Sequence, residues 1–307
     1  MSLPDDSALS QLEYSRVRKE AERALRESGA FGVLPTPMDA IMRAANIEEI
    51  RDDVLDPSLL QQLRHKAGKT GKILKRALSK VLGVFHAPSG LVFIDKSIMA
   101  VKRRFVGFHE SGHGFMPWQR AAYTHVEDCE SALSPGAASL FDREANVFAT
   151  EVLFQLDTFH EQASEHEFGI FTPVRLSKEY NASIYASIRE YVRKNRRNCA
   201  VVVLNNPAPC ENDGFTATLR RYEESDSFVE MFGTGNWPER FTPDDQIGAL
   251  VPLGKTKSSG RHEIVLEDRN NDKHECIAEA FTNSYQVFVL IHEIRSLSTS
   301  MIIMPSI

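Results

Sequence analysis

The chain has 307 residues, of which 42% are hydrophobic and 25% charged, with 17 Gly and 14 Pro. This composition excludes a collagen, a coiled coil and a wholly disordered chain, and the length predicts about two domains. The net charge of −6 argues against a general binder of polyanions. The longest apolar runs are far shorter than the ~20 residues of a membrane helix, and no signal-like apolar core opens the chain. We therefore expect a cytoplasmic protein without membrane contact.

Cysteine usage argues against a thiolate metal site. The cysteines lie far apart and form no CxxC pair, which is typical of reduced thiols rather than of a disulfide framework or a zinc–thiolate cluster. A bound metal would therefore need histidine and carboxylate ligands. The cysteines are Cys129, Cys199, Cys210 and Cys276.

The N-terminal half combines helical patterns with one clear strand. Apolar residues at helical spacing predict helices over residues 9–29, from Met38, over 101–118 and over 140–154. The short apolar run 91–94 predicts a buried strand. Together these elements predict a helical domain with a small sheet.

A stretch from residue 57 to residue 94 contains basic side chains but no acidic one. One interpretation is an amphipathic helix around 73–82 with a solvated basic face. The other is a basic surface for an acidic partner or for DNA phosphates. The sequence leaves both open.

The string His109-Glu110-Ser111-Gly112-His113 matches H-E-x-x-H. On a helix, residues four apart project from one face, so both imidazoles can reach a single Zn²⁺. Glu110 lies beside that face, where it can accept a proton from the attacking water. The apolar residues just before the motif favour a buried active-site helix.

A catalytic zinc takes three protein ligands, so a third ligand must follow. The extended motif with a third histidine is excluded, because that position is Gln119. Glu144, on the following predicted helix, is the preferred candidate and gives the His/His/Glu set of gluzincin-type peptidases. Glu151 is the rival ligand, and a solvated Glu144 beside Arg143 is the alternative without function.

Two segments together resemble the ImmA/IrrE family of zinc metallopeptidases. They are residues 104–113 (RFVGFHESGH) and 144–153 (EANVFATEVL), and residues 32–41 look like the N-terminal segment of that family. The strand 91–94 resembles the one that precedes the metal helix. Such a strand lines the cleft, where an extended substrate can add to its exposed edge.

The resemblance implies an intracellular endopeptidase that cleaves a helix-turn-helix repressor or antitoxin and so derepresses a stress, mobile-element or toxin–antitoxin operon. It implies one Zn²⁺ per chain held by His109, His113 and Glu144, with Glu110 as general base. Imidazole and carboxylate ligands suit Mn²⁺ or Fe²⁺ as well. The alternative function is a DNA-binding transcription regulator, or a toxin–antitoxin component whose peptidase domain mainly docks a partner.

Three further residues are candidates for roles around the metal. Tyr123 and His125 follow the metal helix and can supply an oxyanion donor, or they are ordinary polar residues. Asn146, which follows Glu144 closely, is a candidate to hold a backbone group behind the ligands.

The sequence of residues 176–197 resembles a helix-turn-helix motif, with a turn at Asn181 and a basic run that follows the second helix. One interpretation is DNA reading with phosphate contacts. The other is a helical hairpin that joins two domains. The candidate contacts to nucleic acid or a partner are Arg193, Lys194, Arg196 and Arg197, with Arg189 on the second helix.

Beyond residue 197 the pattern changes to short strand-like runs separated by Gly, Pro, Asn and Asp. These runs cover residues 199–204, 215–222, 247–253, 262–266 and 285–291. The sequence therefore predicts an α+β protein of three parts. They are a zincin-like metallopeptidase domain at 1–160, a helix-turn-helix-like connector at 161–197, and a β-rich, GAF-like sensory or partner-binding domain at 198–307.

Overall fold

The structure is a computed structural model that describes residues 7–49, 83–86, 91–94, 99–128, 133–210, 214–235 and 237–294. It forms two compact units. The N-terminal unit comprises Asp5–Phe159 with Lys178–Ser183, and the C-terminal unit comprises His160–Ser177 with Ile184–Ile307. Both contain helices and strands, so the predicted α+β class is confirmed. Most of the basic stretch 57–94, including its predicted helix, lies outside the described residues.

The helices of the N-terminal unit follow the predicted pattern with shifted ends. The predicted helix 101–118 ends at Phe115, and a separate helix begins at Pro117. Proline is tolerated there because the first turn of a helix leaves its N–H groups without intrahelical partners. The helices are α1 (Gln11–Glu27), α2 (Met38–Ala44), α5 (Ala100–Phe115), α6 (Pro117–Asp128) and α7 (Pro135–Leu153).

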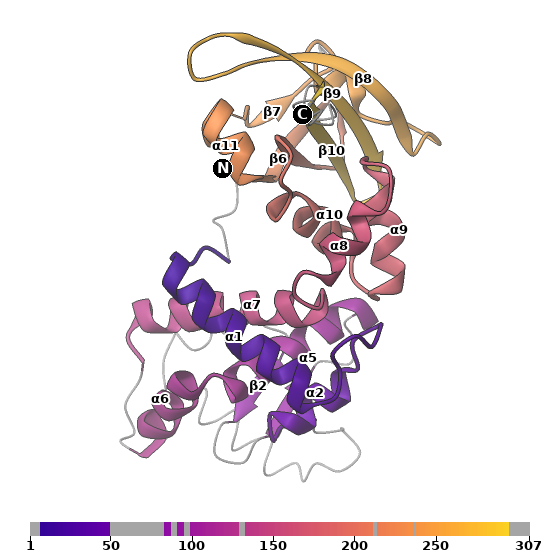
Figure 1. Cartoon of the computed structure of the whole chain (residues 1–307). Helices are drawn as coiled ribbons and strands as arrows, with labels where there is room; N and C mark the ends of the chain where they lie inside the picture. The colour runs from indigo at the N-terminus through magenta and orange to yellow at the C-terminus, as the bar shows by residue number, and fades with distance from the viewer. Residues whose placement is uncertain are drawn as a thin grey trace, which may run out of the picture. The chain divides into compact units, whose positions relative to one another are not determined.

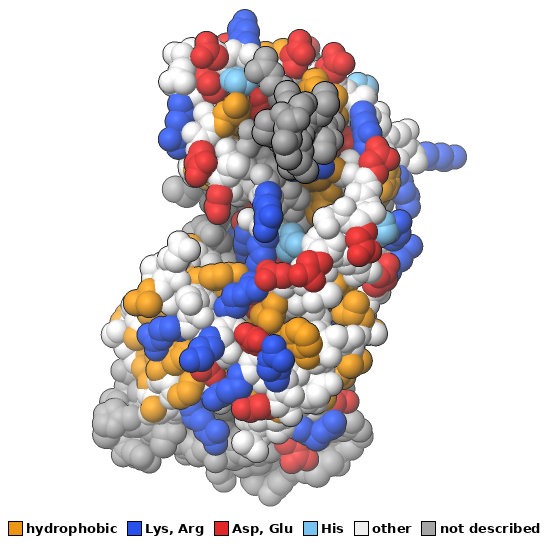
Figure 2. Space-filling view, viewed as in Figure 1, with side chains coloured by type: hydrophobic (Ala, Val, Ile, Leu, Met, Phe, Trp, Pro, Cys, Tyr) orange, Lys and Arg blue, Asp and Glu red, His pale blue; other side chains and the backbone are white. Residues whose placement is uncertain are grey.

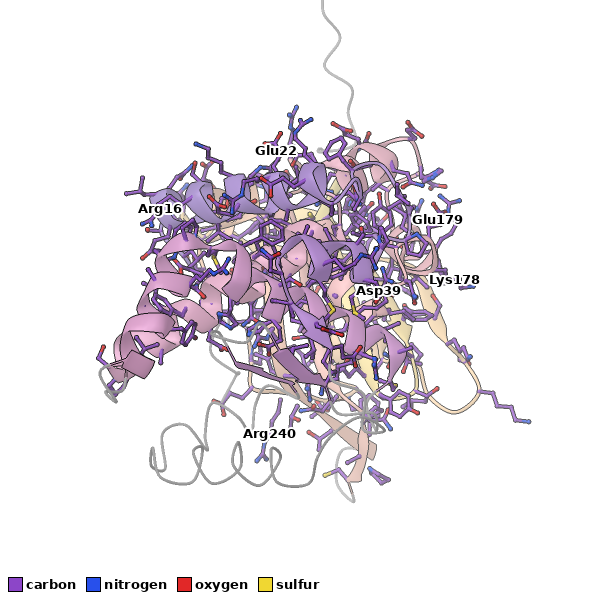
Figure 3. All side chains as sticks on the ribbon, turned by 90° about the horizontal axis from the view of Figure 1, so that it is seen from below. Arg16, Glu22, Asp39, Lys178, Glu179 and Arg240 are labelled. Carbon is purple, nitrogen blue, oxygen red and sulfur yellow. The ribbon has the colours of Figure 1, made fainter. Side chains whose placement is uncertain are left out.

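Helix α1 is amphipathic and starts at a capping box. The Ser10 side chain accepts from the backbone N–H of Glu13, whose carboxylate accepts in return from the backbone N–H of Ser10. Val17, Ala21, Ala24 and Leu25 are buried on its inner face, while Arg16 and Glu22 project from the outer part of the helix (Figure 3). This inner face lies against α7, which also packs on α5 (Figure 1).

A small sheet of three strands accompanies these helices, in the order β1-β3-β2. Strand β3 (Leu91–Ile94) pairs in parallel with β1 (Glu48–Glu49) and antiparallel with β2 (Gly83–His86). The strand 91–94 is therefore confirmed, but it is central. The sequence-based expectation of an exposed edge on this strand is wrong, and β2 lies at an edge of the described sheet instead.

A long antiparallel sheet forms the centre of the C-terminal unit. Its order is β5-β6-β4-β10-β9-β8, and β7 (Arg240–Phe241) pairs with β6. The strands are β4 (Cys199–Asn205), β5 (Ala208–Cys210), β6 (Gly214–Glu224), β8 (Ser258–Glu267), β9 (Lys273–Thr282) and β10 (Gln286–Glu293). Helices α8 (Thr158–Ser164), α9 (Phe171–Glu179) and α10 (Ile184–Arg193) precede it in the chain.

The two faces of this sheet are covered by different segments. The crossover between β6 and β8 contains α11 (Asp226–Phe232) and a 3₁₀ turn at Gly248–Leu250. It packs Phe228, Phe241 and Leu250 onto one face, and α10 packs against β4 and β6 on the other. The predicted strand 247–253 is wrong, because this segment serves as cover rather than as a paired strand.

Aromatic packing ties a late segment of the chain to the N-terminal unit. Tyr180 is fully buried, with its ring centroid 5.9 Å from that of Phe154 and 5.2 Å from that of Phe159. Residues 161–197 are thus divided between the two units.

On the face shown in Figure 2, acidic and basic side chains of the N-terminal unit are interspersed with apolar ones. Within the described residues, no helix is both long and apolar enough to cross a membrane.

Replacing Ser225 by alanine is expected to cost about 2 kcal/mol of unfolding free energy, because buried backbone groups lose their partner. The Ser225 hydroxyl accepts from the N–H groups of Phe228 and Cys199 and donates to the Arg197 carbonyl. The matched variant Ser134→Ala removes an exposed helix cap and is expected to cost about 1 kcal/mol or less. Urea unfolding of both variants measures the difference, and equal costs would contradict the role given to Ser225.

Candidate metal centre

Helix α5 carries the H-E-x-x-H motif in its second half, where every residue from Val106 to Phe115 is buried. Gly112 lies at the contact between the two helices. A Cβ atom there would lie 3.0 Å from the Phe148 ring of α7, which is a tight contact, so glycine favours this close approach of α5 and α7. His109, Glu110 and His113 are exposed by 3%, 3% and 8%. The motif therefore faces the interior of the N-terminal unit, as predicted.

The two imidazoles converge on one point. The Nε2 atoms of His109 and His113 lie 3.3 Å apart. Two nitrogens at about 2.0–2.1 Å from one tetrahedral Zn²⁺ lie about 3.3–3.4 Å apart, so the observed distance fits a shared metal.

The opposite nitrogen of each ring is engaged by an amide oxygen. Nδ1 of His109 lies 2.9 Å from Oδ1 of Asn146, and Nδ1 of His113 lies 2.5 Å from Oε1 of Gln119. An amide oxygen accepts only, so each Nδ1 carries the proton and each Nε2 keeps its lone pair. Asn146 therefore contacts a histidine directly, whereas its sequence position predicted a contact with a backbone group.

Glu144 is buried, with 2% exposed, but the structure does not bring it together with the two histidines. Its Oε2 accepts from Trp118 Nε1 at 2.8 Å and from Gln119 Nε2 at 2.6 Å. Glu151, the rival ligand, accepts from the Tyr14 hydroxyl and from Arg18. Both carboxylates thus serve other partners.

Asp142 is the carboxylate that lies beside the imidazole pair. Its Oδ1 is 3.7 Å from Nε2 of His109, and its side chain is 43% exposed. Sequence reasoning missed Asp142, although it stands four residues before Asn146 and hence on the same face of α7. In the part of the chain that the structure describes, no three His, Cys, Asp or Glu side chains stand close enough to form a complete metal cluster.

Burial governs the protonation of the motif. It lowers the pKa of His109 to about 4 against the effect of the Asn146 hydrogen bond, and burial with the neighbouring His109 lowers the pKa of His113 to about 3. Both rings are therefore neutral near pH 7, which is the form that binds metals. Burial and the negative charge of Asp142 raise the pKa of Glu110 to about 8.

Tyr123 lies against the motif, whereas the side chain of His125 lies outside the described residues. The Tyr123 ring meets the His113 ring edge-on, with centroids 5.5 Å apart. Burial raises the pKa of the Tyr123 hydroxyl, and the charges of Glu110 and Asp142 act in the same direction. The phenol is therefore in electrostatic range of both carboxyl groups.

The helix-turn-helix-like segment has the predicted secondary structure. Helix α9 ends at Glu179, Asn181 has a left-handed backbone with φ of 47°, and α10 begins at Ile184. Asparagine is one of the few residues that adopt this conformation readily.

Most of its basic residues are engaged within the C-terminal unit. Arg189 and Arg193 both contact the Glu223 carboxylate, at 2.8 and 2.9 Å. Lys194 lies 3.2 Å from Glu190, and the Arg197 guanidinium lies 5.2 Å from the centre of the Phe168 ring. Arg196 is exposed. Burial would raise the pKa of Glu223, but the two arginines outweigh it and hold that pKa below its usual range.

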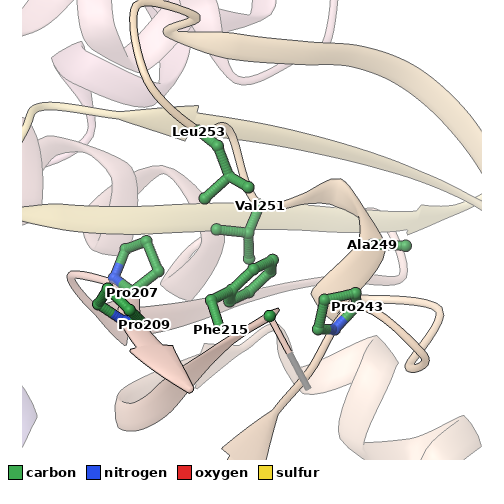
Figure 4. A pocket seen from close by; sticks show the side chains of 8 residues that line it. Pro207, Pro209, Phe215, Pro243, Ala249, Val251 and Leu253 are labelled. Atoms are coloured by element: carbon green, nitrogen blue, oxygen red, sulfur yellow. The ribbon is translucent and has the colours of Figure 1, made fainter. Parts of the chain in front are cut away.

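A hollow of about 520 Å³ lies in the C-terminal unit, between the β5–β6 hairpin and the crossover (Figure 4). Among the described residues that line it, the side chains are apolar and none is titratable. The lining includes Pro207, Pro209, Phe215, Pro243, Val251 and Leu253.

Comparisons with known proteins give information about the fold only. No family model and no curated protein matches the chain. Its structure is similar to that of a Mycobacterium tuberculosis transcriptional regulator, with a TM-score of 0.50 and 13% identity. The match covers 91% of this chain and 76% of that one.

Proposed function

We propose that the N-terminal unit is a zincin-like, zinc-dependent endopeptidase. The observation that carries this proposal is the 3.3 Å separation of the Nε2 atoms of His109 and His113. Two neutral, buried imidazoles that aim their lone pairs at one point form half of a tetrahedral site. Glu110, between them in the sequence, is the carboxyl group that such an enzyme needs.

Asp142 fits the third ligand position better than Glu144. Asn146 contacts the His109 ring, and residues four apart on a helix share a face, so Asp142 is presented to the same histidine. Glu144 is two residues further along, on a different side of α7, and its oxygen is used by Trp118 and Gln119. The 3.7 Å from Asp142 to His109 is only a few tenths of an ångström longer than the about 3.3 Å between ligand atoms on one zinc.

The chemistry divides between the metal and the chain. Zn²⁺, when bound, would polarise the scissile carbonyl and acidify the attacking water. Glu110 takes the proton from that water and returns it to the leaving amine. Tyr123 is placed near Glu110 and Asp142 and donates its hydroxyl hydrogen to the developing oxyanion.

We infer that the substrate is a helix-turn-helix repressor or antitoxin, cleaved in the cytoplasm to derepress an operon. The resemblance of the two metal-helix motifs to the ImmA/IrrE family supports this substrate class. The C-terminal unit, with an antiparallel sheet covered on both faces, supports a GAF-like sensory or partner-binding role.

The alternative is a DNA-binding regulator or a toxin–antitoxin component that docks a partner without cleavage. Phosphate contacts need basic side chains that point to solvent. Arg193 and Lys194 are instead paired with Glu223 and Glu190, so the observations favour the peptidase.

Removing metal is expected to abolish cleavage, and Zn²⁺ is expected to restore it. The chelated protein is titrated with Zn²⁺ in a calorimeter and then incubated with the helix-turn-helix repressor of a neighbouring gene. We expect one Zn²⁺ per chain and fragments only in its presence. Asp142→Asn is expected to weaken zinc binding by at least about tenfold, whereas Glu151→Gln on the same helix keeps it. Co-purification of the repressor without fragments would favour docking, and salt-sensitive DNA binding that survives His109→Ala would favour the regulator.

A further inference from the structure

Strand β8 forms an outer edge of the long sheet in the C-terminal unit (Figure 1). Within the described residues, it pairs with β9 on one side and with no strand on the other. The strand spans ten residues, most of them exposed. An open edge of this length is a template for pairing with another chain, and proteins usually protect it.

The side chain of Gln246 covers the middle of this edge. Its Oε1 accepts from the backbone N–H of Val265 at 2.9 Å, and its Nε2 donates to the Val265 carbonyl at 3.3 Å. In an antiparallel pair of strands, one residue exchanges the same two hydrogen bonds with the residue opposite. Gln246 therefore takes the place that one residue of a neighbouring strand would occupy.

The turn before the 3₁₀ segment holds Gln246 at this position. The Asp245 carboxylate accepts from the backbone N–H of Thr242 at 2.6 Å and from its hydroxyl at 3.1 Å. Ile247, the next residue, is buried in the core of the unit. Gln246 itself is exposed, so the core does not require its side chain. The two hydrogen bonds to Val265 are its only contacts of this kind among the described residues.

The edge that Gln246 covers is complementary to itself. Backbone groups alternate along a strand, so the N–H and C=O groups of residues 261, 263, 265 and 267 point away from β9. When two copies of β8 pair antiparallel about Ile264, Arg261 of one copy lies opposite Glu267 of the other, and symmetry repeats the pair. Opposite charges directly across two strands are favourable. The Arg261 side chain is 51% exposed, although it also contacts Glu279.

We propose that β8 is a docking edge for the same strand of a second copy of this chain, and that Gln246 keeps this edge closed. Pairing about Ile264 uses the backbone groups of Val265 in both copies, and these are the groups that Gln246 occupies. The dimer therefore forms only when the glutamine leaves the edge in both copies. A twofold pairing of this kind closes at two copies. This inference does not depend on the proposed metal centre.

Replacing Gln246 by alanine is expected to make the full chain dimerise. The dimerisation constant is expected to tighten by at least about tenfold, because the hydrogen bonds of Gln246 no longer have to be broken in either copy. Size-exclusion chromatography with light scattering over a range of concentrations measures it. Gln11→Ala, the same substitution at an exposed position of α1, is expected to behave as the unsubstituted protein.

Amide hydrogen exchange locates the interface. In Gln246→Ala, the amides of Glu263, Val265 and Glu267 are expected to exchange more slowly as the concentration rises. Adding Glu267→Arg places like charges opposite each other and is expected to weaken the dimer by at least about tenfold. Adding Glu161→Arg instead makes the same change of charge at an exposed position of α8 and is expected to keep the dimer.

Four results would overturn the proposal. They are a Gln246→Ala protein that stays monomeric, one that forms aggregates larger than a dimer, a dimer that Glu267→Arg does not weaken, and an unsubstituted protein that already pairs through β8. If Gln246→Ala does not fold, Gln246→Asn keeps the amide on a shorter side chain that does not reach both backbone groups. The same dimer is then expected.

Discussion

Replacing Glu110 by glutamine is expected to slow peptide-bond cleavage by about 10²–10⁴-fold, the usual contribution of a general base. Glutamine keeps the volume of the buried side chain but cannot take a proton from the attacking water. Zn²⁺ affinity and thermal stability are expected to stay close to those of the unsubstituted protein, because the imidazole ligands are untouched. Fragment yield from the helix-turn-helix repressor, followed by mass spectrometry over time, measures the rate.

Glu151→Gln provides the matched control. Glu151 is also a buried glutamate, but it accepts from Tyr14 and Arg18 between α7 and α1. Its substitution is expected to leave the cleavage rate unchanged to within a few-fold. If Glu110→Gln cleaves as fast as the unsubstituted protein, Glu110 is not the base and the proposed mechanism is wrong.

Acid is expected to destabilise the C-terminal unit through His292 on β10. Burial lowers the pKa of this ring to about 4, and the charges of Arg261 and Arg197 act in the same direction against a backbone hydrogen bond. The His292 side chain is buried, so it has little water to solvate a positive charge. An unfolded chain protonates histidine near pH 6.5, so protons favour the unfolded state between pH 6.5 and 4. The stability that the neutral His292 ring contributes at pH 7 is therefore lost as the pH falls. At pH 4 the free energy of unfolding is expected to be lower by about 3 kcal/mol.

His292→Phe is expected to remove this pH dependence while keeping a ring against Phe168, whose centroid lies 4.9 Å from that of His292. Urea unfolding at pH 7, 5.5 and 4 measures it. The chain has two tryptophans, so a Trp118→Phe background leaves Trp237 as the fluorescent reporter of the C-terminal unit. His262→Phe, at an exposed position, should leave the pH dependence as it was. A steep acid loss that persists in His292→Phe would contradict the assignment.

Helices with a strong apolar period were predictable from the sequence, and so was the strand 91–94. Strand β9 was not predicted, because its buried face consists mainly of Cys276, Ala278 and Ala280. Small residues alternating with charged ones give a weak strand signal. The run 247–253 was predicted as a strand but is not one. Apolar residues that cover a sheet give the same sequence pattern as apolar residues that form a buried strand.

The shared face of the two histidines on α5 was predictable from the sequence, but which carboxylate of α7 lies beside them was not. His109 and His113 share a face of α5 by their spacing alone. Whether Asp142 or Glu144 faces them depends on the rotation of α7 about its axis. This rotation depends on how α7 packs against α5, for example with Phe148 beside Gly112, and such contacts join residues far apart in the sequence.

The path of the chain has a consequence for how the protein can be divided. The chain enters the C-terminal unit at residue 160, returns to the N-terminal unit over residues 178–183, and then re-enters the C-terminal unit. A single cut at residue 159 would leave Phe154 and Phe159 without the Tyr180 ring that buries them. A cut after residue 197 would instead leave Ile188 and Tyr191 of α10 without their sheet. Either fragment would expose apolar surface and tend to self-associate, so neither unit is expected to be stable when it is expressed without the other.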